Sequence, residues 1–327
     1  MKIYRIAAVL LAWFFVPQYV HSATLPGIPE FIDTMVARHQ FNRGELERVF
    51  VRAQHQPAII EAISRPATLK PWPEYRASFV NPERIRFGLE YWRKHRQTLQ
   101  SAEQKYGVPQ EIILAVIGVE TVYGRDAGKY RVLDALTTLA FDYPRRADFF
   151  RSELENYLLL ARDDQYDLLD VRGSYAGAMG IPQFMPSSHR KYAVDFNGNH
   201  KIDLLNEPTD AIGSVANYLQ GYGWIKGKPV AVRAQTGQIS NGFGAAQQTI
   251  AAWQASGVVP TVSISQGETA RLTDFTMPEG KEYWLAFGNF DVITRYNNSD
   301  FYAMTVLQLA EALKAAREPN GHGGYRP

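Results

Sequence analysis

The chain has 327 residues, of which 46% are hydrophobic and 21% charged, and it carries a net charge of +2. This composition is typical of a globular protein with two or three domains, and so mild a charge does not indicate a nucleic-acid-binding protein. The chain has no cysteine. Disulfides, thiolate metal sites, a cysteine nucleophile and a lipid anchor on an N-terminal cysteine are therefore excluded.

The first residues have the pattern of a secretory signal peptide. Lys2 and Arg5 precede an apolar run over residues 6–16, and Pro17 and the small-residue stretch 20–23 follow it. The run is shorter than the roughly 20 residues that span a bilayer, and the order of basic, apolar and small residues is that of a cleaved signal. We predict a signal peptide over residues 1–22 and a soluble, periplasmic mature protein. The alternative is an uncleaved anchor helix.

The remaining elements predict a mainly α protein of the α+β class. Apolar residues recur at helical spacing in most of the chain, and valines among Gly, Ser and Thr predict short strands over 225–288. Helices are expected at 28–63, about 81–105, 131–141, 146–161, 166–172, 208–220 and 302–316, with a proline-punctuated connection at 65–73. We divide the chain into an N-terminal helical domain (23–95), a catalytic core (96–224), a small antiparallel β domain (225–288) and a closing segment (289–327).

A buried helix that ends in a carboxylate is the first candidate for chemistry. It begins near Pro109, is apolar almost all round, and ends at Tyr123-Gly124 just after Glu120. Burial disfavours the charged carboxylate and raises its pKa, so that Glu120 could donate a proton near neutral pH. The alternative is an ordinary glutamate turned to solvent at a helix end.

A loop over residues 174–188 is the second candidate. Gly177 and Gly180 permit tight turns, and the same loop carries uncharged hydrogen-bonding side chains at Ser174, Gln183 and Ser187. Such groups suit a neutral sugar better than a phosphate. The alternative is a loop with a purely structural role.

Residues 195–203 have the spacing of a calcium loop. Oxygen-bearing side chains occupy positions 1, 3, 5 and 9, but His200 replaces the glycine of position 6 and Asn206 the glutamate of position 12. The alternative is a solvated Asn/Gly turn. The sequence has no HExxH, GxSxG, Walker A or dinucleotide-binding motif.

Five segments, taken together, resemble the lytic murein transglycosylase B family of Gram-negative bacteria. They are ETVYG (120–124), FDYPRRA (141–147), SYAGAMGIPQFMPSS (174–188), DAIGSVANYL (210–219) and NFDVITRYNNSDFYA (289–303). They occur in the family's order over nearly the whole predicted mature chain. The resemblance implies a lysozyme-like helical core flanked by a helical and a β domain. It also implies cleavage of the β-1,4 bond between N-acetylmuramic acid and N-acetylglucosamine, with a 1,6-anhydro product.

The resemblance also implies which residues act. Glu120 is the expected catalyst, and Arg145 and Arg146 are expected near the anionic peptide stem. The other expected substrate-binding residues are Ser174, Gln183, Tyr123, Tyr218, Asn289 and Tyr296. A structural Ca²⁺ is expected at Asp195, Asn197, Asn199, Lys201 and Asp210, with no cofactor needed for the chemistry. The expected partners are peptidoglycan glycan strands, without nucleic acid or a membrane span in the mature chain, and a cell-wall synthase or amidase.

The proposed chemistry distinguishes this reading from its rivals. A glycoside hydrolase generally needs two carboxylates, whereas a lytic transglycosylase needs one, and Asp142 is the nearest candidate for a second. The rival functions are a muramidase that uses water, a non-catalytic peptidoglycan-binding module, and a calcium-regulated structural protein. A binding module would not need a buried Glu120.

Overall fold

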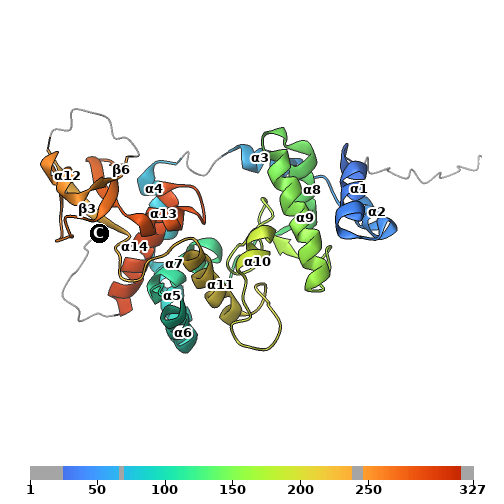
Figure 1. The fold of residues 1–327 in the computed structure, drawn as a ribbon, viewed down its shortest axis with the longest axis horizontal. Helices are drawn as coiled ribbons and strands as arrows, with labels where there is room; N and C mark the ends of the chain where they lie inside the picture. Colours follow the sequence, from blue (N-terminus) through green and yellow to red (C-terminus); the bar gives the residue numbers. More distant parts are fainter. Residues whose placement is uncertain (1–24, 66–69, 238–245, 318–327) are drawn as a thin grey trace, which may run out of the picture.

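The computed structural model describes residues 25–65, 70–237 and 246–317, so the predicted signal peptide lies outside the described residues. The fold is mainly helical with one small antiparallel sheet, as predicted. The molecule is elongated, with the first helices at one end and the sheet at the other (Figure 1). Within the described ranges, no helix is both long and apolar enough to cross a membrane.

The N-terminal helices pack against two long helices from the middle of the chain. The predicted helical stretch 28–63 forms α1 (Ile28–His39), α2 (Arg43–Val51) and α3 (Pro57–Ser64). The breaks have local causes, since Gln40 takes a left-handed conformation and Asn42 caps α2 by accepting a hydrogen bond from Glu45 N. These helices share one apolar cluster with α8 (Val132–Asp142) and α9 (Ala147–Asp163).

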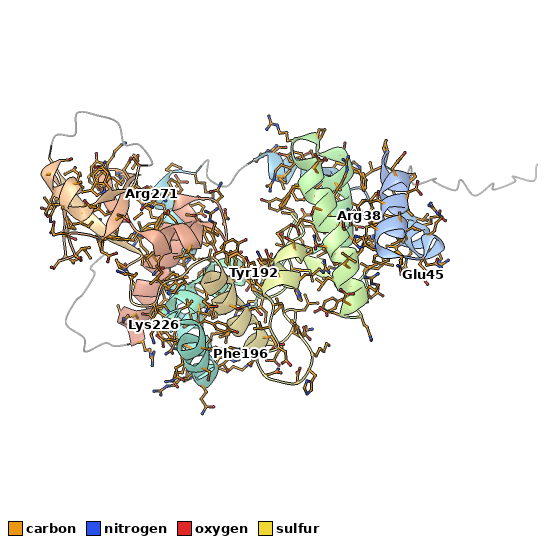
Figure 2. All side chains as sticks on the ribbon, in the orientation of Figure 1. Arg38, Glu45, Tyr192, Phe196, Lys226 and Arg271 are labelled. Carbon is orange, nitrogen blue, oxygen red and sulfur yellow. The ribbon has the colours of Figure 1, made fainter. Side chains whose placement is uncertain are left out.

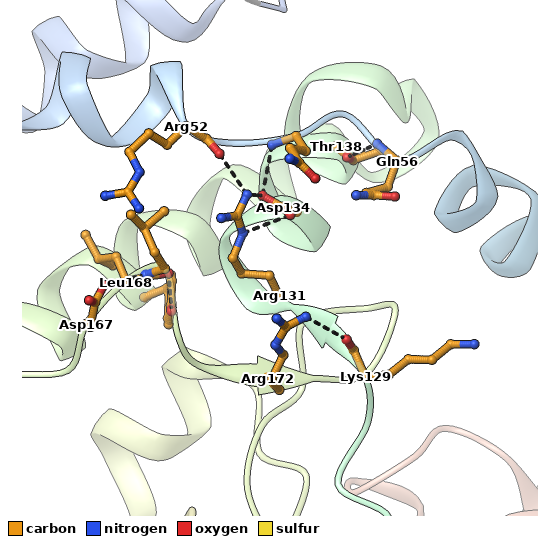
Figure 3. Close-up of polar contacts among 12 residues, drawn as sticks. Arg52, Gln56, Lys129, Arg131, Asp134, Thr138, Asp167, Leu168 and Arg172 are labelled. Atoms are coloured by element: carbon orange, nitrogen blue, oxygen red, sulfur yellow. Dashed lines mark hydrogen bonds and ion pairs between the residues drawn. The ribbon is translucent and has the colours of Figure 1, made fainter. Parts of the chain in front are cut away.

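A buried ion pair fastens this N-terminal unit to α8 (Figure 3). Asp134 is 4% exposed and accepts hydrogen bonds from Arg131 Nε at 2.9 Å and from Gln54 N at 2.9 Å. Arg131 also donates to the carbonyl of Arg52 at 2.7 Å. Because these bonds satisfy backbone groups of residues 52–54, they fix the connection between α2 and α3 against the start of α8.

A second apolar cluster forms the central body around α7 (Gln110–Thr121). The predicted helix over 81–105 is two helices, α5 (Pro82–Lys94) and α6 (Arg96–Tyr106), separated at His95. A further helix, α4 (Trp72–Phe79), begins at the end of the proline-punctuated connection and fills the gap before the next predicted helix. Pro73 lies in its first turn, where a missing N–H costs nothing. The body is completed by α11 (Pro208–Gly221) and α14 (Asp300–Arg317).

The predicted helix at 166–172 is wrong. Gln165 takes a left-handed conformation, and Asp167 Oδ1 accepts a hydrogen bond from Leu169 N, which stabilises a turn. The chain then enters β2 (Arg172–Gly173), which pairs with β1 (Tyr130–Arg131). The apolar residues read as a helix face, Leu168 and Leu169, pack on the N-terminal cluster from this turn instead.

The late part of the chain forms the predicted antiparallel sheet, with strand order β4-β6-β7-β3-β5. Its strands are β3 (Ala231–Thr236), β4 (Gln248–Thr249), β5 (Val258–Pro260), β6 (Thr269–Met277) and β7 (Gly280–Ala286), with α12 (Ile250–Ala255) packed on them. Val262 and Ile264, expected in strands, lie outside them. From β7 the chain returns through α13 (Gly288–Thr294) to the central body.

The apolar clusters group the chain differently from the predicted boundary between residues 95 and 96. The central cluster joins Trp72 and Tyr91 to residues of α7, α11 and α14, while the N-terminal cluster includes α8 and α9. The third cluster belongs to the sheet and α12. The domain limits stay a prediction, and the site described next lies on the central cluster.

Candidate active site

Glu120 is the last residue but one of α7, and it is partly exposed at the end of an otherwise buried helix. Burial raises the pKa of its carboxyl from the ordinary value of 4.5 to about 7, although a hydrogen bond from Tyr302 lowers it somewhat. The helix stops abruptly after Thr121, because Val122 and Tyr123 both take positive φ angles, 51° and 62°. Such a conformation is strained for a β-branched residue, and strain of this kind concentrates at functional sites.

Four tyrosines surround the carboxylate. Tyr302, only 2% exposed, donates a 2.6 Å hydrogen bond from its hydroxyl to Glu120 Oε1. The pKa values of Tyr75, Tyr218 and Tyr296 are raised by burial first and by the nearby charge of Glu120 as well. The rings form a continuous row, since Tyr302 stacks on Tyr296 at 6.3 Å and Tyr296 lies 4.7 Å from Tyr218. The acid thus lies beside an aromatic wall in which Tyr218 and Tyr302 are buried and Tyr296 is partly exposed, so Tyr296 is the ring best placed for the apolar face of a sugar.

Sequence analysis named Tyr218 and Tyr296 but not the other two tyrosines. Tyr302 stands at the start of the predicted closing helix, and Tyr75 lies in α4, between the predicted connection at 65–73 and the predicted helix at about 81–105. Tyr302 follows Glu120 by 182 positions. The available signal was an aromatic residue inside the closing motif, in the first turn of a helix that packs on α7.

The loop over 174–188 is attached to the site from two sides. Thr121, the residue after Glu120, donates from Oγ1 to the carbonyl of Ile181 at 2.8 Å. Tyr296 donates from its hydroxyl to the carbonyl of Pro182 at 2.6 Å. The structure therefore brings this loop and Glu120 together, as the sequence predicted.

Two polar side chains of the loop keep free capacity for a ligand. Gln183 donates from Nε2 to the carbonyls of Ala127 and Gly180, and its Oε1 has no partner among the described residues. The hydroxyl oxygen of Ser174 accepts from the amides of Ala176 and Ala178, which leaves its proton to donate. Both side chains are partly exposed.

Two predicted binding residues lie elsewhere. Asn289 is 2% exposed and its amide is saturated, since Oδ1 accepts from Ile225 N and Nδ2 donates to the carbonyls of Ile225 and Lys228. Tyr123 is 5% exposed and packs against Gly88 and Gly118 in the core. Both environments favour structural roles for these side chains, and their contact with substrate stays a prediction.

The arginine pair, Arg145 and Arg146, lies outside the central body that carries Glu120. It stands on the short turn Pro144–Arg146 between α8 and α9. Both side chains are exposed, and the Arg146 guanidinium lies 4.2 Å from the ring of Phe149. No described residue forms an ion pair with Arg145 or Arg146. Both cations are therefore available to an anionic ligand.

No carboxylate among the described residues contributes to the pKa shift of Glu120. Only burial and the Tyr302 hydrogen bond shift its pKa, so no neighbouring carboxylate acts on it. Asp142, the candidate for this role, lies at the end of α8, where its Oδ2 pairs with His55 Nε2 at 2.8 Å. The arrangement is that of a single general acid rather than of the paired carboxylates of a hydrolase.

The loop over 195–203 has the backbone of a calcium loop. His200, at the position where such loops carry glycine, takes the left-handed conformation, with φ of 67°. Asp195 accepts hydrogen bonds from the amides of Gly198, Asn199 and His200, and Asn197 and Asn199 each accept an amide two residues on. This donor set of hard oxygens fits Ca²⁺. The described residues contain no cluster of three or more His, Asp or Glu side chains that could hold a metal, so most ligands would be neutral.

The remaining expected ligands have other partners. Asp210 is fully buried on α11 and its carboxylate accepts from the amides of Phe196, Asn197 and Asp203. It therefore ties the loop to the central body. The amine of Lys201 lies 3.8 Å from Asp203 Oδ2. Coordination by these two residues stays a prediction.

Fold and site together define a lysozyme-like protein with a partly buried acid beside an aromatic wall, and comparison with known proteins gives the family. The model of the transglycosylase SLT domain matches residues 25–311. The membrane-bound lytic murein transglycosylase B of Escherichia coli K12 is 44% identical over 307 residues, which cover 90% of this chain and 84% of that protein. The chain belongs to the transglycosylase SLT domain family.

Solved structures agree with this assignment. The soluble lytic transglycosylase SltB1 from Pseudomonas aeruginosa superposes with a TM-score of 0.83 at 46% identity, covering 89% of this chain and 99% of that one. The Escherichia coli lytic transglycosylase Slt35, solved in complex with calcium, gives 0.84 at 44% identity, covering 90% and 95%. Slt35 has also been solved in complex with bulgecin A. The predicted family, fold class and enzyme class are confirmed.

Proposed function

We propose that this enzyme cleaves the β-1,4 bond between N-acetylmuramic acid and N-acetylglucosamine in peptidoglycan and leaves a 1,6-anhydro end, with Glu120 as the only acid and base. The observation that carries the proposal is a partly buried carboxyl with a pKa of about 7 and no carboxylate partner among the described residues. At neutral pH such a group is present in both protonation states. It can therefore give up a proton and take one back within one turnover.

Protonation comes first. Glu120 donates its proton to the glycosidic oxygen, and the bond from C1 of the muramyl ring to that oxygen breaks. The ring then carries oxocarbenium character, which its own N-acetyl group stabilises. The hydroxyl of Tyr302 donates to Glu120 Oε1 and stabilises the carboxylate that the first step leaves behind.

Ring closure follows. The Glu120 carboxylate accepts the proton of the C6 hydroxyl of the same sugar, and the C6 oxygen bonds to C1. Because this nucleophile is part of the substrate, its effective concentration exceeds that of a diffusing water. The enzyme returns to its starting protonation state without a second carboxylate.

Substrate binding is assigned as follows. Tyr218 and Tyr296 present the aromatic wall to the sugar, and Ser174 and Gln183 bind its hydroxyl or N-acetyl groups. Arg145 and Arg146 bind carboxylates of the peptide stem. The residues Asp195, Asn197 and Asn199 hold a structural Ca²⁺, which stabilises the loop beside α11 and takes no part in bond cleavage.

The enzyme is proposed to act in the periplasm after removal of residues 1–22, beside a cell-wall synthase or amidase. The support is the basic, apolar and small-residue order of that segment and the location of its substrate.

Mass spectrometry of the muropeptides released from purified sacculi tests the proposal. The wild-type enzyme is expected to release 1,6-anhydro products, and Glu120→Gln none. Reducing ends from the wild type would mean a hydrolase instead, and no release from folded wild-type protein would favour the binding module.

A further inference from the structure

One arginine of the sheet joins both ends of the segment that carries Tyr296 and directly precedes Tyr302. Arg271 lies on β6, where the sheet meets α13 and α14 (Figure 2). Its Nε donates to Asp291 Oδ1 at 3.0 Å, and its two terminal nitrogens donate to the two oxygens of Asp300 at 2.7 Å each. Asp291 belongs to α13 and Asp300 is the first residue of α14. Segment 291–300 is thus closed into a loop by a single guanidinium.

The closed loop positions Tyr296 and the start of α14, which carries Tyr302, beside Glu120. Tyr296 lies in the middle of segment 291–300, and Tyr302 follows Asp300 by two residues. Beyond the loop, their hydroxyls bind the carbonyl of Pro182 and Glu120 Oε1. Any shift in the start of α14 therefore moves the hydroxyl that bonds to the acid.

The contact has the geometry of a rigid clamp. Arg271 binds Asp300 through two parallel hydrogen bonds, an arrangement that fixes orientation as well as distance. Thr273 Oγ1 donates to Asp300 Oδ2 at 2.8 Å, and Gln247 Nε2 donates to Asp291 Oδ2 at 3.0 Å, so both carboxylates are held a second time. The Arg271 side chain is 17% exposed and also lies 5.2 Å from the ring of Phe290. Burial would raise the pKa of Asp300, but the hydrogen bonds from Arg271 and Thr273 outweigh it and lower that pKa.

We propose that Arg271 is a positioning residue for catalysis, and that the β domain serves the reaction by holding segment 291–300 so that Tyr302 keeps its hydrogen bond to Glu120. This inference rests on the role of Glu120 in the proposed function. It gives the sheet a part in the reaction although it supplies no side chain to the tyrosine wall.

A matched variant pair provides the test. Arg233 lies on β3 of the same sheet, pairs with Glu282 and lies 5.7 Å from the ring of Trp284. Arg271→Met and Arg233→Met therefore remove the same charge and the same kind of contacts from one sheet. Turnover of a soluble glycan substrate is measured across pH for both variants, for Tyr302→Phe, and for the Arg271→Met/Tyr302→Phe double variant. Circular dichroism and thermal unfolding monitor folding.

The expected result is a fall in kcat of about 10- to 100-fold for Arg271→Met with little change in KM, as for an active-site group displaced by about 1 Å. Arg233→Met should match the wild type. The alkaline limb of the pH profile should move upward in Arg271→Met as in Tyr302→Phe, because both changes remove the hydrogen bond that favours the carboxylate; the phenols of Tyr75, Tyr218 and Tyr296, on which the charge of Glu120 also acts, stay in place. The double variant should be no less active than the less active of the two single variants, because both changes remove the same hydrogen bond from Tyr302 to Glu120.

The proposal is overturned if Arg271→Met matches Arg233→Met in rate and pH profile, or if the losses multiply in the double variant. If Arg271→Met does not fold, Asp300→Asn replaces it in the test, because this variant keeps the shape of the clamp but weakens its charge. The same outcomes then support or overturn the proposal. Glu120→Gln is assayed in parallel. Residual anhydro product from that variant would overturn the proposed function, whereas an inactive Glu120→Gln beside an unaffected Arg271→Met would overturn this inference alone.

Discussion

The hydrogen bond from Tyr302 to Glu120 sets where on the pH scale the acid works. Tyr302→Phe removes the hydroxyl that lies 2.6 Å from Oε1 and leaves the ring in place. A hydrogen bond to a charged group is worth about 1.5–3 kcal/mol, and one pKa unit corresponds to about 1.36 kcal/mol. Because the bond favours the carboxylate, its loss should raise the pKa of Glu120 by about 1 to 2 units above the present value of about 7.

The assay is the pH dependence of kcat/KM for release of anhydro products. Glu120 must be protonated to begin the reaction, so the wild-type rate should fall as the pH rises through about 7. In Tyr302→Phe this alkaline limb should lie about 1 to 2 units higher, with a lower plateau because the carboxylate formed in the first step is less well stabilised. A carboxyl carbon resonance of Glu120 followed by NMR would report the same shift directly.

Tyr157→Phe is the control. Tyr157 is fully buried and donates to the carbonyl of Leu168 at 3.0 Å, in the N-terminal cluster. Its loss should lower stability and leave the alkaline limb in place. An unchanged limb in Tyr302→Phe, or a limb moved to lower pH, would refute the assignment of Tyr302 as the group that stabilises the charged acid.

Three further predictions concern stability. The pKa of Glu120 in the folded state, about 7, lies above the ordinary 4.5, so Glu120 binds its proton more tightly in the folded than in the unfolded state. Glu120 therefore destabilises the protein increasingly as the pH rises from about 4.5 to about 7. Glu120→Gln should raise the free energy of unfolding in urea by up to about 3 kcal/mol at pH 8 and by almost nothing below pH 4. Gly180 and Gly198 share a φ of 75°, but a Cβ at Gly180 would lie 2.4 Å from Leu204 O, whereas Gly198 has open space; Gly180→Ala should cost several kcal/mol and Gly198→Ala about 1 kcal/mol, measured by the same denaturation. Millimolar Ca²⁺ should raise the thermal midpoint of the wild type, and Asp195→Ala should abolish that rise.

Each of these has an outcome that contradicts it. A pH-independent gain in Glu120→Gln would mean that the glutamate is not buried in its charged form. Equal losses at the two glycines would show that the loop tolerates the contact with Leu204. A calcium response that survives in Asp195→Ala would place the ion elsewhere.

Local pattern was enough to predict most of the fold. The buried helix of Glu120 was recognisable because residues 112–119 are apolar without a polar face, and the valine-rich, Gly- and Ser-punctuated stretch was recognisable as strands. The failures have local causes. A first-turn proline made α4 resemble a connection, and two leucines of a capped turn at 166–172 resembled a helix face.

The site was predictable only where it is continuous in sequence. Glu120 and the loop at 174–188 carry their chemistry in short strings, so motif spacing found them. Tyr302 and Tyr75 reach the acid through tertiary packing, which spacing cannot report. Asn289 and Tyr123 show that a motif residue can also have partners within the fold, which spacing does not report either. Asn289 binds the backbone of the 225–228 turn, and Tyr123 fills the space beside two helix glycines.

The central claim is that the C6 hydroxyl of the muramyl sugar, deprotonated by Glu120, attacks C1 of the same sugar, and that water takes no part. Digestion of sacculi in ¹⁸O-labelled water, with mass spectrometry of the new muramyl ends, tests it most directly. We expect ends that are lighter by one water than reducing ends and that carry no ¹⁸O from the first turnover onward. New ends that contain one ¹⁸O at C1 would contradict the account, because they would show that water, activated by a second group, completes the reaction.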